Sequence, residues 1–121
     1  SLGGPTVLRV AERLHDVKLK ALFSVSGFQK EPDFPGNERI TPFVQEGFSW
    51  EKIRNNTEHI FVFNSDNDPY VPLKEGEILH DKLGGVYRTF QNRNHLNRWG
   101  ETREEGEQTF PEILEEILKL T

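Results

Sequence analysis

The amino-acid sequence predicts an α/β fold in which helices alternate with the strands of a mostly parallel sheet. Three short apolar runs, at 19–26, 59–64 and 86–91, are rich in Val, Ile, Leu and Phe, as buried strands usually are. Stretches with apolar residues at helical spacing precede, separate and follow these runs. This alternation implies right-handed crossovers and places ligands outside the carboxyl ends of the strands.

Each expected helix has a start or stop signal. Apolar residues recur at helical spacing over 5–16, where Pro5 suits the first turn. Ser49 is a favourable N-cap for a short helix at 49–56. "PLKEGEILHDKLGG" predicts a helix stopped by its glycine pair, and "FPEILEEILKL" predicts a closing helix with one apolar face. We therefore expect residues 1–121 to form a single incomplete domain with about three strands and four helices.

The amino-acid composition limits the classes of protein and partner that fit this chain. With 34% hydrophobic and 29% charged residues, the chain is that of a globular domain. The net charge of −5 argues against a nucleic-acid partner, because phosphate binding needs clustered Lys and Arg. No apolar stretch approaches the length of a membrane span, so no membrane partner is expected. The lack of cysteine excludes disulfides and thiolate metal sites and fits a cytoplasmic protein, and no metal-binding histidine spacing occurs.

Three polar residues stand where the carboxyl edge of such a sheet would bring them together. Ser1 opens "SLGG", which matches the second half of G-x-S-x-G, the turn that exposes a hydrolase nucleophile. Asp68 follows the second strand in "DPYVP", and His95 follows the third strand. The order Ser, Asp, His along the chain is that of an α/β-hydrolase catalytic triad.

Other residues compete for these roles. Asp66 is a second candidate for the acid, although an Asp in a turn-rich stretch commonly braces the turn. His15 and His80 lie on expected helices and His59 precedes a strand, so all three suit surface or packing positions. Ser1 has an alternative interpretation as an ordinary terminal residue without a role.

Three segments together carry a family resemblance: "SLGGPTVLRVAERL", "FSWEKIRNNTEHIFVFNSDNDPYVP" and "NHLN". On these segments the chain resembles the retinoblastoma-binding protein nine-like serine hydrolases, a small α/β-hydrolase family. The resemblance runs over nearly the whole chain but covers only the C-terminal portion of the family's fold, starting at the nucleophile. One departure is local: Asn94 and Leu96 flank His95 where the family has a glycine and an aromatic residue.

The resemblance implies a role for each matched residue. Ser1 would be the nucleophile, His95 the general base and Asp68 the acid that orients the histidine. The backbone N–H of Leu2 would donate to the oxyanion. The implied activity is that of a serine hydrolase without a cofactor, acting on a small acyl substrate such as an ester, thioester or amide.

The segment 29–48 is expected to complete the substrate site. It has three prolines, two glycines and little periodicity, which predicts a long irregular insertion. Because it follows the first strand, it should leave the sheet at the carboxyl edge and lie over Ser1 as a lid. Low-polarity side chains would then face the acyl group, with Phe34, Phe43, Phe48 and Trp50 as candidates.

The three-stranded sheet needs a neighbour, because parallel sheets are normally covered on both faces and flanked by further strands. We expect a missing N-terminal half, or another chain, to cover the sheet edge. The alternative to an active hydrolase is a noncatalytic interaction module, or one half of a split enzyme that works only when paired.

Overall fold

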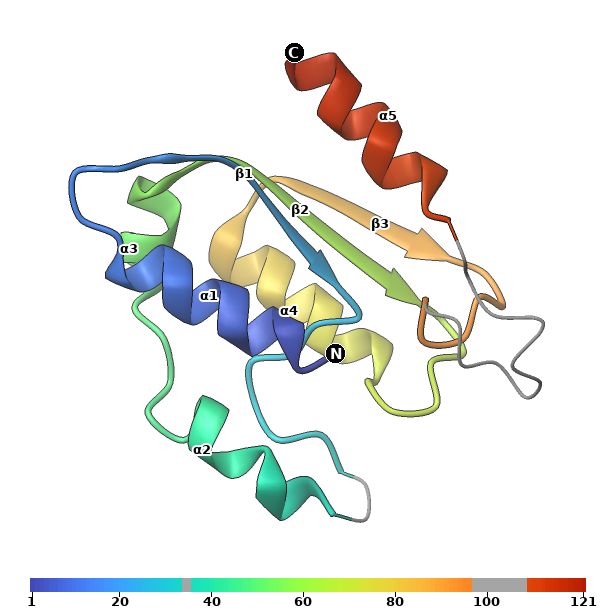
Figure 1. The fold of residues 1–121 in the computed structure, drawn as a ribbon. Coiled ribbons are helices and arrows are strands. Elements are labelled where there is room, and N and C mark those ends of the chain that lie inside the picture. Colours follow the sequence, from blue (N-terminus) through green and yellow to red (C-terminus); the bar gives the residue numbers. More distant parts are fainter. Residues whose placement is uncertain (34–35, 97–108) are drawn as a thin grey trace.

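The computed structural model describes residues 1–33, 36–96 and 109–121, and it contains a parallel sheet in the order β1-β2-β3 (Figure 1). The strands are β1 (Leu19–Val25), β2 (Thr57–Ser65) and β3 (Val86–Phe90). The middle strand, β2, is buried over its last six residues, as its central position requires. The α/β fold expected from the sequence is confirmed, and all three strands end at the same edge.

Helices cover both faces of the sheet (Figure 1). One face carries α1 (Gly3–Arg13), α3 (Trp50–Asn55) and α4 (Leu73–Leu83), and the other carries α5 (Pro111–Leu120). On the first face, fully buried Leu8, Ile53 and Leu79 meet Val62 of the central strand. On the second face, aromatic residues dominate, and Phe110 stacks on Phe63 with ring centroids 5.9 Å apart.

The first helix begins two residues earlier than predicted and ends at Arg13 instead of residue 16. Its start follows from Gly4, whose missing side chain lets the helix pass close to the loop after β1. A Cβ atom on Gly4 would come within 2.7 Å of the Gly27 Cα atom. The helix ends early because Leu14 is extended and Asp16 adopts a left-handed conformation with φ of 57°. The close approach at Gly4 holds the residues before α1 against the end of β1.

The insertion is more regular than predicted. Its described part contains a 3₁₀ turn, η1 (Asn37–Arg39), and a single-turn helix, α2 (Thr41–Val44), so the described chain has more helices than the four expected. Val44 packs with Phe28 and Val71 in a small apolar cluster apart from the main core. Arg9 of α1 donates a hydrogen bond of 2.8 Å to the carbonyl of Gly47, so the insertion is fastened to the helical layer.

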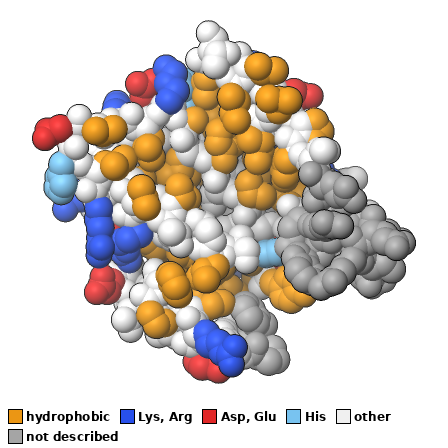
Figure 2. All heavy atoms as spheres, viewed as in Figure 1, with side chains coloured by type: hydrophobic (Ala, Val, Ile, Leu, Met, Phe, Trp, Pro, Cys, Tyr) orange, Lys and Arg blue, Asp and Glu red, His pale blue; other side chains and the backbone are white. Residues whose placement is uncertain are grey.

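Part of the second face stays accessible. Figure 2 shows apolar side chains gathered in the upper part of the view, where Figure 1 has β1 and α5. On β1 the alternate residues Ala21, Phe23 and Val25 are only partly buried. On α5, Leu114 and Leu118 are 56% and 62% exposed. None of the helices in the described ranges combines the length and the apolar character needed to cross a membrane.

Candidate active site

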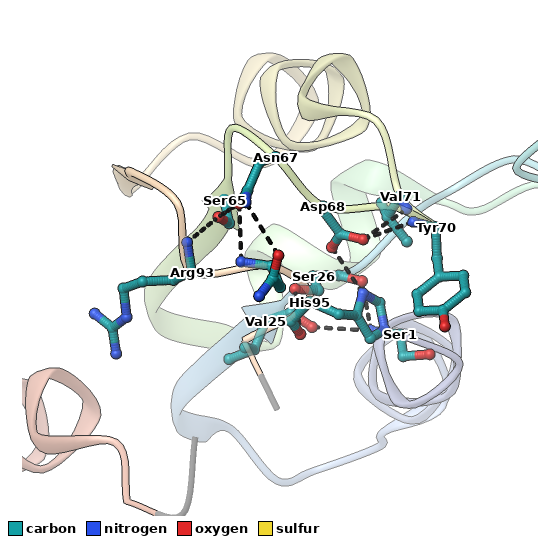
Figure 3. Close-up of polar contacts among 11 residues, drawn as sticks. Ser1, Val25, Ser26, Ser65, Asn67, Asp68, Tyr70, Val71, Arg93 and His95 are labelled. Atoms are coloured by element: carbon teal, nitrogen blue, oxygen red, sulfur yellow. Dashed lines mark hydrogen bonds and ion pairs between the residues drawn. The ribbon is translucent and has the colours of Figure 1, made fainter. Parts of the chain in front are cut away.

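The three residues predicted to act together lie at one end of the sheet (Figure 3). Ser1 stands immediately before α1, Asp68 follows β2, and His95 follows β3. Ser1 and His95 both contact Ser26, the residue that follows β1. The residues before α1 and the loops after β2 and β3 thus each bring one polar side chain to the carboxyl edge of the sheet.

Asp68 and His95 form the best-defined contact of the site. His95 Nδ1 lies 2.7 Å from Asp68 Oδ2, and the two side chains are 5% and 0% exposed, respectively. The other carboxylate oxygen accepts hydrogen bonds from the backbone N–H groups of Tyr70 at 2.9 Å and Val71 at 3.0 Å. Both oxygens of Asp68 are therefore engaged, and the expected contact between Asp68 and His95 is confirmed.

These contacts set the electrostatics of the carboxylate. Burial by itself would raise the pKa of Asp68, but the hydrogen bonds from His95, Val71 and Tyr70 more than offset it and lower the pKa below its usual value. Asp68 is consequently an anion at neutral pH. A buried carboxylate on Nδ1 favours the histidine tautomer that carries its proton there and leaves Nε2 free to accept one.

Ser1 is held by its backbone. Its α-amino group donates hydrogen bonds to the carbonyls of Val25, at 3.0 Å, and Ser26. In Figure 3 Ser1 lies beside the His95 ring, and no hydrogen bond joins Ser1 Oγ to His95 among the described contacts. Such bonds are often long before substrate binds.

Leu2, the predicted oxyanion donor, lies at the start of α1. It is the N-cap residue of α1, with φ of −56° and ψ of −26°. The first N–H groups of a helix have no acceptor within the helix and carry the positive end of its dipole. The Leu2 N–H is therefore a suitable donor to a developing negative charge next to Ser1.

The predicted substrate-pocket residues separate into three groups. Phe34 lies outside the described residues. Phe43 is 42% exposed and lines a groove of about 630 Å³ between α1 and the insertion. Phe48 and Trp50 instead pack on each other, with ring centroids 5.4 Å apart, and border the main core; the Arg9 guanidinium covers the Phe48 ring at 4.5 Å.

The placement of Phe48 and Trp50 shows which described residues they contact, while their role in an acyl pocket stays a prediction. Arg9, whose guanidinium covers the Phe48 ring, lies two helical turns beyond Ser1 in the middle of α1, and Phe48 and Trp50 both pack against the main core. The described contacts of the insertion include α1, Phe28 and Val71, the main core through Phe48, and Glu75, which accepts a hydrogen bond from the Gln29 N–H at 3.0 Å. A lid over Ser1 remains a prediction.

The competing residues have other roles. Asp66 Oδ1 accepts a hydrogen bond of 2.8 Å from the Asn92 N–H, so its described side-chain contact is with the loop after β3. His80 stacks on Tyr87, with ring centroids 5.5 Å apart. The remaining two histidines, His15 and His59, are exposed. No group of three His, Cys, Asp or Glu side chains suited to a metal ion occurs within the described ranges.

The sequence did not reveal the polar residues that form hydrogen bonds to the loop containing His95. Ser26 Oγ donates a hydrogen bond of 3.0 Å to the His95 carbonyl, and Asn67 contacts Asn94 through both its amide atoms. The sequence contained one signal for an unusual loop backbone: "NRNH" places asparagine next to His95, and asparagine tolerates a left-handed backbone conformation. The contacts of Ser26 have no such signal, since its partner is distant in the chain.

Comparison with known proteins agrees with this geometry. The model of a family described as serine hydrolase matches residues 1–117. The chain is 35% identical over 96 residues to the rat protein "Serine hydrolase RBBP9" and 31% identical over 97 residues to "Putative hydrolase YdeN" of Bacillus subtilis. Each match covers 79% of this chain and 50% of the relative, so the chain spans about half the length of these curated relatives.

A solved structure gives the same result for the fold. The crystal structure of the ydeN gene product from Bacillus subtilis superposes with a TM-score of 0.85 at 26% identity. The superposition covers 99% of this chain and 61% of that one. The sheet and helices described here thus have the arrangement of an α/β-hydrolase-type enzyme. With its family model matched over nearly every residue and its polar residues gathered at the carboxyl edge of the sheet, the chain belongs to the serine hydrolase family.

Proposed function

We propose that this chain carries the Ser-His-Asp triad of a serine hydrolase, with Ser1 as nucleophile, His95 as general base and Asp68 as the orienting acid. The observation that carries the proposal is the buried contact of 2.7 Å between Asp68 Oδ2 and His95 Nδ1, next to Ser1. A carboxylate in this place keeps the proton on Nδ1 and stabilises the imidazolium that forms during catalysis.

The reaction follows from these roles. Ser1 Oγ attacks the acyl carbonyl while His95 Nε2 takes the hydroxyl proton, and the carbonyl oxygen becomes an oxyanion next to the Leu2 N–H. His95 returns the proton to the leaving group, which departs and leaves an acyl-enzyme. Water then attacks the acyl-enzyme with His95 again as base, releasing the acid and restoring Ser1.

The substrate class that we propose is an ester, thioester or amide of modest size. One feature next to the base suits an acyl group. Tyr70 packs edge-on against His95, with ring centroids 5.2 Å apart, and is 48% exposed, so it offers apolar surface beside the base. The chemistry assigned to Ser1, His95 and Asp68 is complete without a cofactor.

We also propose that a further polypeptide segment covers the edge of the sheet at β1, either the N-terminal half of the same protein or another chain. The supporting facts are the partly exposed apolar residues of β1 and the relatives of about twice this length. An oxyanion usually has two donors, and the second commonly comes from a loop of an earlier strand. The alternative function, one half of a split enzyme, is favoured by the same facts.

Hydrolysis kinetics test the proposal. Ester hydrolysis is measured for the 121-residue chain and for the chain extended by the upstream half of the Bacillus subtilis relative. We expect activity in the extended form that disappears in Ser1→Ala and His95→Ala. His59→Ala is a matched control, because His59 is an exposed histidine outside the site. Equal activity in both forms that is unaffected by His95→Ala would contradict the triad.

A further inference from the structure

We propose that Asn67 is a positioning residue for His95, acting together with Ser26 on the backbone of the loop at 92–96. The inference rests on the proposed function, because it assigns these side chains the task of holding the general base. Neither side chain would touch the substrate. Each acts through the main chain on either side of His95, so the orientation of the imidazole depends on them.

Asn67 is joined to the residue before His95 by two hydrogen bonds. Its Oδ1 accepts from the Asn94 backbone N–H at 2.8 Å, and its Nδ2 donates to Asn94 Oδ1 at 3.0 Å. The same Oδ1 accepts from the Ser65 hydroxyl at 2.9 Å, and Ser65 Oγ accepts from the Arg93 N–H at 3.0 Å. The loop after β2 is therefore hydrogen-bonded to the loop after β3 immediately before His95 (Figure 3).

Ser26 makes a hydrogen bond to His95 itself, through the carbonyl group of His95. Its Oγ donates a hydrogen bond of 3.0 Å to the His95 carbonyl, and Ser26 is 1% exposed. Its own backbone is fixed by the hydrogen bond of 2.8 Å from its N–H to the Phe63 carbonyl. Because a second contact of Ser26, through its carbonyl, reaches Ser1, one buried serine ties the proposed nucleophile to the proposed base.

The loop needs these supports because its backbone is unusual. Asn92, Asn94 and Leu96 all have positive φ, at 55°, 50° and 51°. Asparagine adopts this conformation at modest cost, but leucine does not, and such residues persist only where the surroundings hold them. The histidine sits between two of them. Without the contacts to Asn67 and Ser26, the loop would relax, and the His95 ring would move relative to Asp68 and Ser1.

Asn67→Ala tests the inference, because it removes all three hydrogen bonds of the amide without adding bulk. The control is Asn56→Ala. Asn56 Nδ2 donates to the carbonyls of Ala11 at 2.9 Å and Leu14 at 3.2 Å, and Asn56 lies at the opposite end of β2. The control therefore loses side-chain amide bonds of the same kind far from His95. Asn67→Asp keeps the acceptor, loses the donor and adds a negative charge between Asp66 and Asp68.

Two readouts separate the inference from the proposed function. The first is the hydrogen-bonded Nδ1 proton of His95, observed by nuclear magnetic resonance and assigned by its loss in His95→Ala. The second is kcat and KM for ester hydrolysis by the extended chain. We expect Asn67→Ala to weaken or abolish the proton resonance and lower kcat on the order of 10-fold with KM little changed, since small misplacements of a catalytic group are costly. Asn67→Asp should recover most of both signals.

Each outcome tests either the proposed function or the positioning role of Asn67. If the unsubstituted extended chain has the Nδ1 resonance and no hydrolytic activity, the proposed function fails, while the effect of Asn67 on the resonance still decides the inference. An unchanged resonance and an unchanged kcat in Asn67→Ala would overturn the inference. An equal loss of resonance in Asn56→Ala would also overturn it, because the effect would then come from general destabilisation.

Discussion

At the residue scale, Asp68 has the most sharply defined role. One carboxylate oxygen accepts from two backbone N–H groups, which fixes the turn, and the other faces His95. Asp68→Asn keeps an oxygen for the turn but presents an amide N–H to the histidine, which favours the wrong tautomer. We expect kcat to fall by about 10⁴-fold, as in other serine triads whose acid is converted to an amide.

Asp66→Asn is the matched control for that substitution. It makes the same chemical change in the same turn, and it keeps the oxygen that accepts from the Asn92 N–H. Its kcat should stay within about 2-fold of the original, because the Asp66 carboxylate does not contact His95. Steady-state kinetics of the two variants, side by side, would expose an error in the choice of acid if Asp66→Asn proved the more damaging.

Carboxylates with lowered pKa values also predict how stability depends on pH. Hydrogen bonds lower the pKa of Asp68 below its usual value, and contacts with Arg93 do the same for the pKa of Glu112. A carboxyl whose pKa is lower in the folded state stabilises the fold above its unfolded pKa, and this contribution is lost as pH falls through the folded pKa. The free energy of unfolding should therefore decrease progressively below about pH 4.5.

Urea denaturation at a series of pH values measures this dependence. Asp68→Asn removes one of the responsible groups, so its stability should fall less steeply between about pH 4.5 and pH 2 than that of the unsubstituted chain. Identical slopes for the two proteins would mean that the contact with His95 does not stabilise the folded state.

At the scale of elements, the packing of α1 against the end of β1 depends on a single glycine. A Cβ on Gly4 would meet the Gly27 backbone, whereas a Cβ on Gly3 would have nothing within 4 Å. Gly4→Ala should destabilise the fold by about 1–3 kcal/mol, as overpacked substitutions do. Gly3→Ala should be neutral or stabilising by up to about 1 kcal/mol, because alanine favours a helix.

The two glycine variants make a matched pair for thermal or chemical denaturation. Gly4→Ala should also lower hydrolytic activity beyond its effect on stability, because displacing α1 moves Ser1. If Gly4→Ala were as stable as Gly3→Ala, the close approach of α1 to Gly27 would not be a feature of the protein in solution.

The elements themselves were largely predictable from the sequence. The predicted strand boundaries lie within two residues of the observed ones, because continuous apolar runs such as "HIFVF" have few other interpretations. The insertion was harder, because one-turn helices such as α2 depend on tertiary contacts more than on periodicity. The packing of Phe48 and Trp50 against the main core was likewise not predictable, because an aromatic residue looks alike in sequence whether it fills the core or faces a ligand.

The order of the candidate site residues along the chain was predictable from the sequence, but the hydrogen bonds that hold them in place were not. Ser1, Asp68 and His95 each follow or precede a recognisable element, so the rule that parallel strands end at one edge was sufficient to group them. Ser26 and Asn67 act through hydrogen bonds to a distant backbone. Such bonds require knowledge of which loops are neighbours, which no local pattern of residues contains.

At the scale of the whole molecule, the apolar surface over β1 and α5 predicts how the 121-residue chain behaves alone. Leu118 is 62% exposed, whereas Ile113 on the same helix packs against the aromatic cluster. Leu118→Lys should reduce self-association and binding of a hydrophobic dye, with stability changed by less than about 0.5 kcal/mol. Ile113→Lys should lower stability by about 1–3 kcal/mol, because it places a charge against the core.

Sedimentation, dye fluorescence and urea denaturation of the two variants check this distinction. If both variants lost the same stability, α5 would be packed on both sides, and the surface would not be available to a covering segment. A Leu118→Lys chain that binds as much dye as the unsubstituted one would place the accessible apolar surface elsewhere.

The central claim is that Ser1 is a nucleophile activated by His95, and reaction with a fluorophosphonate tests it most directly. The chain is treated alone and in the extended form, and the modified peptide is located by mass spectrometry. The account predicts a covalent adduct on Ser1 in the extended form, absent in Ser1→Ala and strongly slowed in His95→Ala. An adduct that persists in Ser1→Ala, or no adduct in either form, would contradict it.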